Sequence, residues 1–285
     1  MEPGIDLLVV SSSPKAYFSV LQGQRAWAAA RSPSVDQRAY TAALEDNLFQ
    51  PLHPLTHAEF AGGKGEELGR DGVPGKMQSL ISSSALACNI FDPWRDQGIG
   101  ELGRALGIGP SYQVRGFEAT HPTGLPGTPP HLDLELAALG LPVVGIESKF
   151  TEPYRRVKNA FRPSYFGATA VWTQMPRALD LAGRVVNTTE SFQHLHVAQL
   201  IKHALGLQRS FGSGGFILYY LWYRTIGSEG DRHADEIDRF QGLIDGEFDF
   251  RHLTYQELLL SLTDGPPGWL EYVRGRYINV DRPTI

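Results

Sequence analysis

The fold of this chain can be worked out from one segment, Pro142-Val143-Val144-Gly145-Ile146-Glu147-Ser148-Lys149-Phe150. Its first half is apolar and rich in β-branched residues, which is typical of a buried strand. Because side chains alternate along a strand, Glu147 and Lys149 are predicted on one face and Ser148 on the other. The segment is therefore a buried strand that ends in an acid and a base on the same side.

A second strand is predicted directly upstream, at His131-Leu132-Asp133-Leu134-Glu135-Leu136. Its three leucines alternate with three polar residues, so the leucines are expected on one face and the polar residues on the other. A two-residue turn at Leu139-Gly140 separates this run from the strand over 142–150. The two strands are therefore expected to pair as a hairpin.

Further elements are predicted on both sides of this hairpin. A strand over 112–117 is followed by Glu118 and then by a Pro/Gly-rich loop at 122–130. The aromatic run 216–223 predicts a central strand. Helices are predicted over 78–91, 100–106 and 190–207, and a further helix begins with a capping box at Thr254 and Glu257. This mixture of strands and helices indicates an α/β protein.

The first part of the chain has weaker signals. Apolar residues spaced as on a helix occur over 40–48, and glycines and a proline crowd residues 62–75. The Gly-rich run lacks the spacing of a phosphate-binding loop. We therefore predict a loop-rich N-terminal extension over 1–77 and a main domain over 78–285.

Composition excludes several classes of protein. The 285 residues are 42% hydrophobic and 20% charged, as in ordinary globular domains. A single cysteine, Cys88, excludes an intrachain disulfide and a cysteine-based zinc site. No run approaches the ~18 apolar residues of a membrane helix, and the N-terminus lacks the basic residues of a signal peptide. The protein is expected to be cytoplasmic and to have no membrane partner.

The charge distribution points to one basic region. The net charge is −5, so a wholly basic nucleic-acid-binding surface is excluded. Between Lys149 and Arg162, however, five basic residues stand against one acid, Glu152. A local basic patch on an acidic protein suits contact with phosphates at one place.

The two hairpin strands carry a chemically specific set of side chains. Asp133 and Glu147 can converge on one hard divalent cation, which prefers oxygen ligands. Lys149 points to the same side and can stabilise an anionic transition state. Glu118, at the end of the preceding strand, can add a third carboxylate. Metal-assisted hydrolysis of a phosphodiester needs such a set.

These residues resemble a known family. The segment Ile146-Glu147-Ser148-Lys149-Phe150-Thr151-Glu152-Pro153-Tyr154 is similar to the third motif of the PD-(D/E)xK nuclease superfamily, and closest to a little-characterised bacterial branch. Leu132-Asp133-Leu134 is similar to the Asp motif, although Pro129-Pro130 stand three residues upstream instead of directly before the aspartate. Gln199 and Lys202 resemble the Gln and basic residue on the following helix. The resemblance covers roughly 78–262.

The resemblance implies a restriction-endonuclease-like fold, with a mixed central sheet flanked by helices. It also implies Asp133 and Glu147 as ligands of Mg²⁺ or Mn²⁺, and Lys149 as the catalytic lysine. An upstream acid completes such sites. We favour Glu118 because it lies nearest in the predicted sheet, while Glu101 and Glu67 compete for that position. The residues expected to contact the substrate are Arg155, Arg156 and Lys158, which directly follow the lysine strand, together with Gln199 and Lys202.

The expected function is Mg²⁺-dependent cleavage of DNA in restriction, defence or repair. A symmetric homodimer would suit cleavage of both strands of a duplex. The alternative is a nucleic-acid-binding protein that keeps the nuclease fold without catalysis. A different metal-dependent hydrolase is a further alternative. The complete set of Asp133, Glu147 and Lys149 favours an enzyme.

Overall fold

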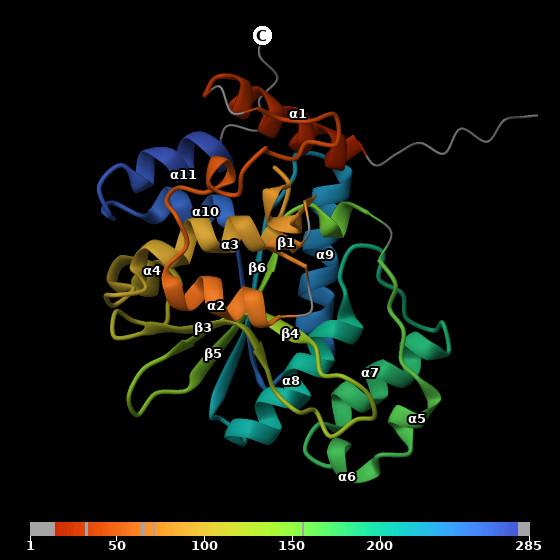
Figure 1. Cartoon of the computed structure of the whole chain (residues 1–285). Coiled ribbons are helices and arrows are strands. Elements are labelled where there is room, and N and C mark those ends of the chain that lie inside the picture. Colours follow the sequence, from red (N-terminus) through yellow and green to blue (C-terminus); the bar gives the residue numbers. More distant parts are fainter. Residues whose placement is uncertain (1–14, 32–33, 64–65, 71, 156, 279–285) are drawn as a thin grey trace, which may run out of the picture.

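The protein is built around a five-stranded mixed sheet (Figure 1). The structure, a computed structural model, describes residues 15–31, 34–63, 66–70, 72–155 and 157–278. The first three strands of the sheet run antiparallel to one another, and the last three run parallel. This mixed sheet confirms the predicted α/β architecture. In spatial order the strands are β3 (Gln113–Thr120), β4 (His131–Ala137), β5 (Val143–Lys149), β6 (Phe216–Trp222) and β7 (Asp249–Thr254).

Helices cover both faces of the sheet and create two cores. Side chains of β6 alternate between these cores, and all seven of its residues are buried, as predicted for a central strand. The helices on the first face are α3 (Ser83–Phe91), α4 (Gly100–Ala105), α10 (Tyr255–Ser261) and α11 (Trp269–Tyr277). Those on the second face are α7 (Pro176–Val186), α8 (Val197–Phe211) and α9 (Ser228–Leu243).

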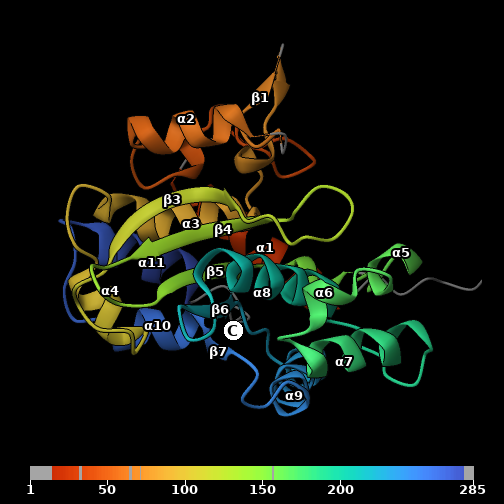
Figure 2. The same ribbon diagram turned by 90° about the horizontal axis from the view of Figure 1, so that it is seen from below.

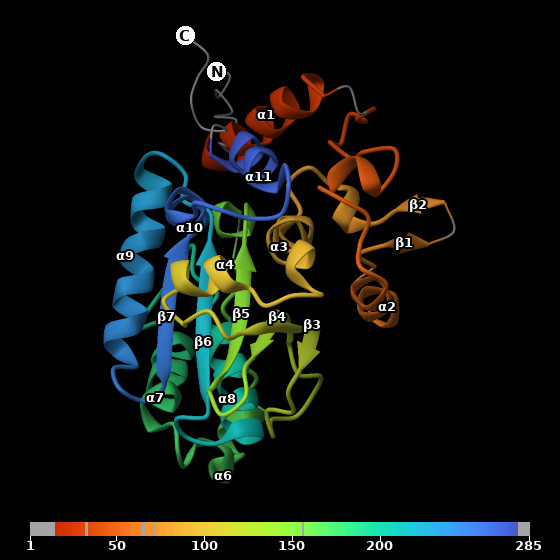
Figure 3. The same cartoon turned by 90° about the vertical axis from the view of Figure 1, so that its left-hand side faces the viewer.

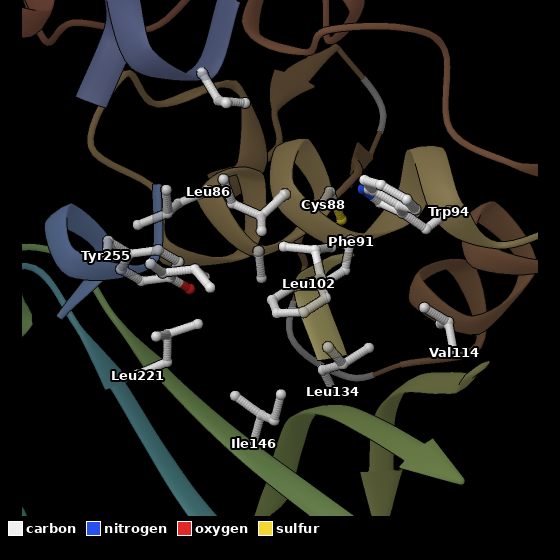
Figure 4. Close-up of a cluster of buried hydrophobic side chains, with 14 of the residues drawn as sticks. Leu86, Cys88, Phe91, Trp94, Leu102, Val114, Leu134, Ile146, Leu221 and Tyr255 are labelled. Carbon is white, nitrogen blue, oxygen red and sulfur yellow. The ribbon is translucent and has the colours of Figure 1, made fainter. Parts of the chain in front are cut away.

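The first core holds β5 in the middle of the sheet (Figure 4). Leu86 and Phe91 of α3 pack over Ile146 and Leu221, and all four side chains are completely buried. Burying a side chain of this size contributes about 1.5–3 kcal/mol. Helix α3 ends at Phe91 as predicted but begins at Ser83, later than the predicted start at residue 78, and the Ser82 hydroxyl caps it by accepting a hydrogen bond from the Ala85 amide.

The N-terminal segment packs onto the same core (Figure 3). It contains α1 (Lys15–Ala29), α2 (Pro54–Gly62) and a two-stranded hairpin of β1 (Gly69–Arg70) and β2 (Val73–Pro74). Val20 and Phe60 belong to the same buried cluster as the residues of α3. The boundary predicted at residue 77 is therefore not marked by a break in the core.

The predicted helix over 190–207 is wrong at both ends. Helix α8 begins at Val197 and continues past Gly206 to Phe211. The carboxylate of Glu236 on α9 accepts hydrogen bonds from three consecutive backbone amides, those of residues 193–195. A distant side chain thus satisfies these amides and keeps the segment before α8 out of the helix.

The helical spacing over 40–48 also does not produce an α-helix. Only a short 3₁₀ turn forms, at Glu45–Asn47. The buried side chain of Asn47 donates hydrogen bonds to the carbonyls of Met77 and Ser79 at 2.7 and 2.8 Å. Tertiary hydrogen bonds therefore outweigh the local preference of this segment.

The connection from β5 to β6 is long because parallel neighbours need a crossover. It contains α7, α8 and two short helices, α5 (Pro163–Phe166) and α6 (Thr169–Trp172). Helices α5, α6 and α7 gather at one end of the molecule, away from α4, α10 and α11 (Figure 2). In the described part of the chain, no helix is long and apolar enough to cross a membrane.

Candidate active site

Strands β4 and β5 place Asp133 beside Glu147. The register pairing of the two strands ends at Leu134 and Ile146, so the acids lie one residue beyond that pair on either strand. Oδ2 of Asp133 accepts a hydrogen bond from the backbone N–H of Ser148 at 2.7 Å. At this position the Asp133 side chain, instead of a backbone carbonyl of β4, accepts the hydrogen bond from the β5 backbone. The hairpin predicted from the sequence is correct and brings both acids to one point.

Glu147 is held between two basic side chains. Lys149 Nζ donates a hydrogen bond to Glu147 Oε1, and His203 Nε2 on α8 lies 2.8 Å from Oε2. The side chains of Glu147 and His203 are each only 1% exposed. Burial opposes ionisation of Glu147, but Lys149 and His203 outweigh it and lower the pKa of Glu147 to about 2. Glu147 therefore stays charged at neutral pH.

Asp133 has the opposite electrostatic situation. Burial and the neighbouring charge of Glu147 raise the pKa of Asp133 well above its usual value, and Lys149 and the Ser148 amide offset this only in part. Two adjacent carboxylates in a poorly solvated place repel each other. A cation bound between them would relieve that repulsion.

Glu118 adds a third carboxylate from the edge strand β3. In the register of β3 and β4 it falls opposite Asp133, and its Oε2 lies 3.2 Å from Nδ1 of His131. Its φ angle is 55°, a left-handed conformation that costs a residue other than glycine about 1–2 kcal/mol. Such strain is concentrated at functional sites. Burial and the charges of Glu67 and Glu147 raise the pKa of Glu118 to about 7.

The predicted alternation of β4 is wrong at one position. Leu134 packs in the first core, but Leu132 packs in the second, on the side of α8. The same change of face occurs on β3 between Phe117 and Ala119. The left-handed Glu118 lies at this point of the ladder and interrupts the regular pleat, so side chains on its two sides turn to opposite faces.

The structure separates the acids predicted to compete with Glu118. Glu67, in the segment between α2 and β1, is close enough for its charge to raise the pKa of Glu118. Burial raises the pKa of Glu67 itself. Glu101, on the first turn of α4, instead pairs with Arg104 at 3.4 Å. The N-terminal segment therefore contributes an acid to the surroundings of the site.

The donor set fits a small divalent cation. In the described residues, no three His, Cys, Asp or Glu side chains are arranged to hold one ion. Mg²⁺, however, is usually bound by one or two carboxylates together with water and substrate phosphate. Oε2 of Glu147 makes no hydrogen bond of good geometry to any described residue, although it is buried. Asp133 and Glu147 thus offer two adjacent carboxylates, of which Glu147 Oε2 has His203 Nε2 at 2.8 Å as its ion-pair partner.

Helix α8 brings the predicted Gln199 and Lys202 to this end of the sheet. Oε1 of Gln199 lies 3.1 Å from Nδ1 of His196, the residue that precedes the helix. Burial and the positive charge of Lys149 lower the pKa of His196, so His196 lies close to β5. Lys202 lies one turn beyond Gln199 and is partly buried.

The basic residues after β5 lie at the surface. Arg155 is exposed, and its guanidinium carbon lies 4.8 Å from the ring centroid of Tyr17 on α1. Lys158 is also exposed. Arg156 lies outside the described residues. A contact of this segment with phosphates stays a prediction.

Sequence reasoning missed His203. It lies on the same face of α8 as Gln199, four residues away, and about two turns after His196. Polar residues at positions 196, 199 and 203 follow helical spacing and fall on one face, which was an available signal. The sequence could not show that β5 passes directly beneath them.

We expect His203→Leu to destabilise the fold by about 3 kcal/mol, because it leaves the buried Glu147 carboxylate without one of its two basic partners. Urea unfolding monitored by circular dichroism measures the effect. His252→Leu serves as the control, since His252 is partly exposed and its nearest carboxylate, of Asp238, is 3.7 Å away. An equal loss in both variants would contradict a special role for the His203 contact.

Comparison with known proteins identifies the family. The chain belongs to the family described as restriction endonuclease associating with ARP, whose profile matches residues 30–278. The mixed sheet flanked by helices is consistent with a restriction-endonuclease-like fold. Searches of the curated proteins and of the solved structures found no significant match.

Proposed function

We propose that this protein is a Mg²⁺-dependent endonuclease that hydrolyses DNA phosphodiester bonds through a PD-(D/E)xK-type site. The observation that carries the proposal is the meeting of Asp133, Glu147 and Lys149 at the end of β4 and β5. Membership of a restriction-endonuclease family supports it and favours DNA as the substrate. A restriction or defence role is the context that fits this family best.

Asp133 and Glu147 would hold the ion, Mg²⁺ or Mn²⁺. When bound, the ion would polarise the phosphate and lower the pKa of a water molecule. Glu147 is suited to this role because Lys149 and His203 keep its carboxylate ionised. Asp133 is suited because a cation would offset the charge that burial disfavours.

Lys149 would act on the phosphate. The charges of Glu147 and Asp133 raise the pKa of Lys149 despite its burial, so Lys149 stays protonated. A protonated amine cannot be a metal ligand. Its ammonium group can hydrogen-bond to the non-bridging phosphate oxygens, where negative charge grows in the transition state. The contact with Glu147 fixes its position on β5.

The remaining predicted residues would complete the site. Glu118 contributes a third carboxylate opposite Asp133, available as an ion ligand or as a proton acceptor. Gln199 and Lys202 would contact the substrate from α8, and Arg155, Arg156 and Lys158 from the segment after β5.

Incubation with supercoiled and linear DNA tests the proposal, with Mg²⁺, Mn²⁺ or EDTA in parallel. We expect cleavage with either ion and none with EDTA. Single-stranded RNA in the same buffers tests the choice of substrate. Binding of DNA without cleavage under every condition would instead support a non-catalytic DNA-binding protein.

Asp133→Ala should abolish Mn²⁺ binding, because it removes one of the two carboxylates proposed to hold the ion at the junction of β4 and β5. Isothermal titration calorimetry of the purified variant, without DNA, measures this. Asp180→Ala on α7 is a matched control at an exposed acid. An unchanged Mn²⁺ affinity in Asp133→Ala would remove the basis for this metal site.

A further inference from the structure

Three basic side chains beside the loop between β3 and β4 have no acidic partner among the described residues. They are Arg162, which immediately precedes α5, and Lys202 and Arg209 of α8, and we call them the α8 cation cluster. None forms an ion pair or a side-chain hydrogen bond with any described residue. By contrast, Arg184, Arg224 and Arg251 each contact a carboxylate within 3 Å.

The glycines of the β3–β4 loop make room for this cluster. A Cβ added to Gly124 would lie 3.0 Å from Nη1 of Arg209, and one added to Gly127 would lie 3.6 Å from Nη1 of Arg162. Helix α8 touches the same loop, because a Cβ on Gly206 would meet the His121 carbonyl at 2.6 Å. The loop, the start of α5 and the outer face of α8 therefore form one continuous surface.

Lys202 shows that this surface lacks a counter-ion. Its side chain is partly buried, and both burial and the charge of Arg162 lower the pKa of Lys202. Two neighbouring cations without an acid between them repel each other. Their arrangement is unfavourable in the free protein and becomes favourable when an anion binds.

The cluster continues from the candidate active site. Along α8, Gln199 and His196 stand next to the catalytic strand, Lys202 follows one turn later, and Arg209 two turns after that. The ten residues from Gln199 to Arg209 span about 15 Å of helix. This equals the axial length of about four base pairs of DNA.

We propose that Arg162, Lys202 and Arg209 bind phosphates along one DNA strand and guide it into the active site. The inference rests on the proposed function and specifies which surface holds the substrate beyond the cleaved bond. Side chains that contact only phosphates do not distinguish sequences. The cluster therefore supplies affinity and position, and any sequence preference comes from elsewhere.

Salt-dependent binding to a mixed-sequence duplex tests this proposal, with fluorescence anisotropy measured in EDTA. The test variant is Arg162→Gln/Lys202→Gln/Arg209→Gln. The matched control is Arg184→Gln/Arg224→Gln/Arg251→Gln, which removes the same net charge from acid-paired arginines. Each lost phosphate contact lowers the slope of log K against log salt by about 0.9, so the test variant should lose about 2.7. At 0.1 M salt its affinity should fall on the order of 10²-fold.

The outcomes separate this inference from the proposed function. The proposed role of the α8 cation cluster is refuted if the test variant keeps the wild-type slope of log K against log salt. It is also refuted if test and control variants lose the same amount of slope, even if the wild type cuts DNA. If the wild type binds DNA through the cluster but does not cut it, only the proposed nuclease activity is refuted. A wild type that neither binds nor cuts overturns both. The single variant Arg209→Gln, at an exposed position, should still lose about 0.9 of slope if the triple variant folds poorly.

Discussion

Replacing Lys149 with methionine should reduce DNA cleavage at least 100-fold while metal binding survives. Methionine keeps most of the apolar stem of the buried side chain and removes its charge. The loss of one charged contact to the transition state typically costs 10²–10³ in rate. His203 still contacts Glu147 in this variant, so Glu147 keeps one basic neighbour for its buried carboxylate.

Single-turnover cleavage of a labelled duplex measures the rate in this variant, and Mn²⁺ calorimetry with thermal unfolding establishes that it is loaded and folded. DNA affinity should change only modestly, because the α8 cation cluster is intact. A wild-type cleavage rate in folded Lys149→Met would refute the mechanism and leave only the fold and the family.

Asp133→Asn should make the metal-free protein more stable while abolishing cleavage. Asparagine keeps an oxygen that can accept the Ser148 amide and removes the charge that burial and Glu147 disfavour. A gain of about 1 kcal/mol would raise the Tm by roughly 2–4 °C in a domain of this size. Thermal unfolding in EDTA measures the gain. Adding Mn²⁺ should stabilise the wild type and leave the variant unchanged.

The pH dependence of this gain has a definite sign. Because the pKa of Asp133 is raised in the folded state, its ionised form destabilises the wild type at pH values above that folded pKa. As the pH falls toward about 4, the usual value for aspartate, the carboxyl group becomes protonated in the folded protein and the penalty disappears. The advantage of Asp133→Asn should therefore vanish near pH 4 and grow as the pH rises from there toward the raised folded pKa. Asp180→Asn, at an exposed acid, should show no such trend. A variant less stable than the wild type at neutral pH would contradict the proposed repulsion.

Sequence patterns were most informative where local periodicity and burial agree. The hairpin of β4 and β5, the buried strand β6 and the capping box before α10 all appear as predicted. In each case the chain carries the signal within a few residues. By contrast, α1, α9 and β7 were not predicted. Helix α9 is rich in charged residues, and β7 includes Asp249, Arg251 and His252, so neither shows a strong apolar pattern.

The sequence alone predicted which residues of the candidate site meet. Asp133, Glu147 and Lys149 lie on two strands joined by a short turn, and the alternation of a strand is enough to bring them to one place. Only the tertiary structure decided which distant groups join them. His203 comes from a helix 54 positions after Lys149, and Glu67 from a segment 66 positions before Asp133. The sequence also did not predict the left-handed conformation of Glu118 or the α8 cation cluster. The packing of separate elements determines where the backbone is strained and which cations lack a counter-ion. Residue order alone does not determine either.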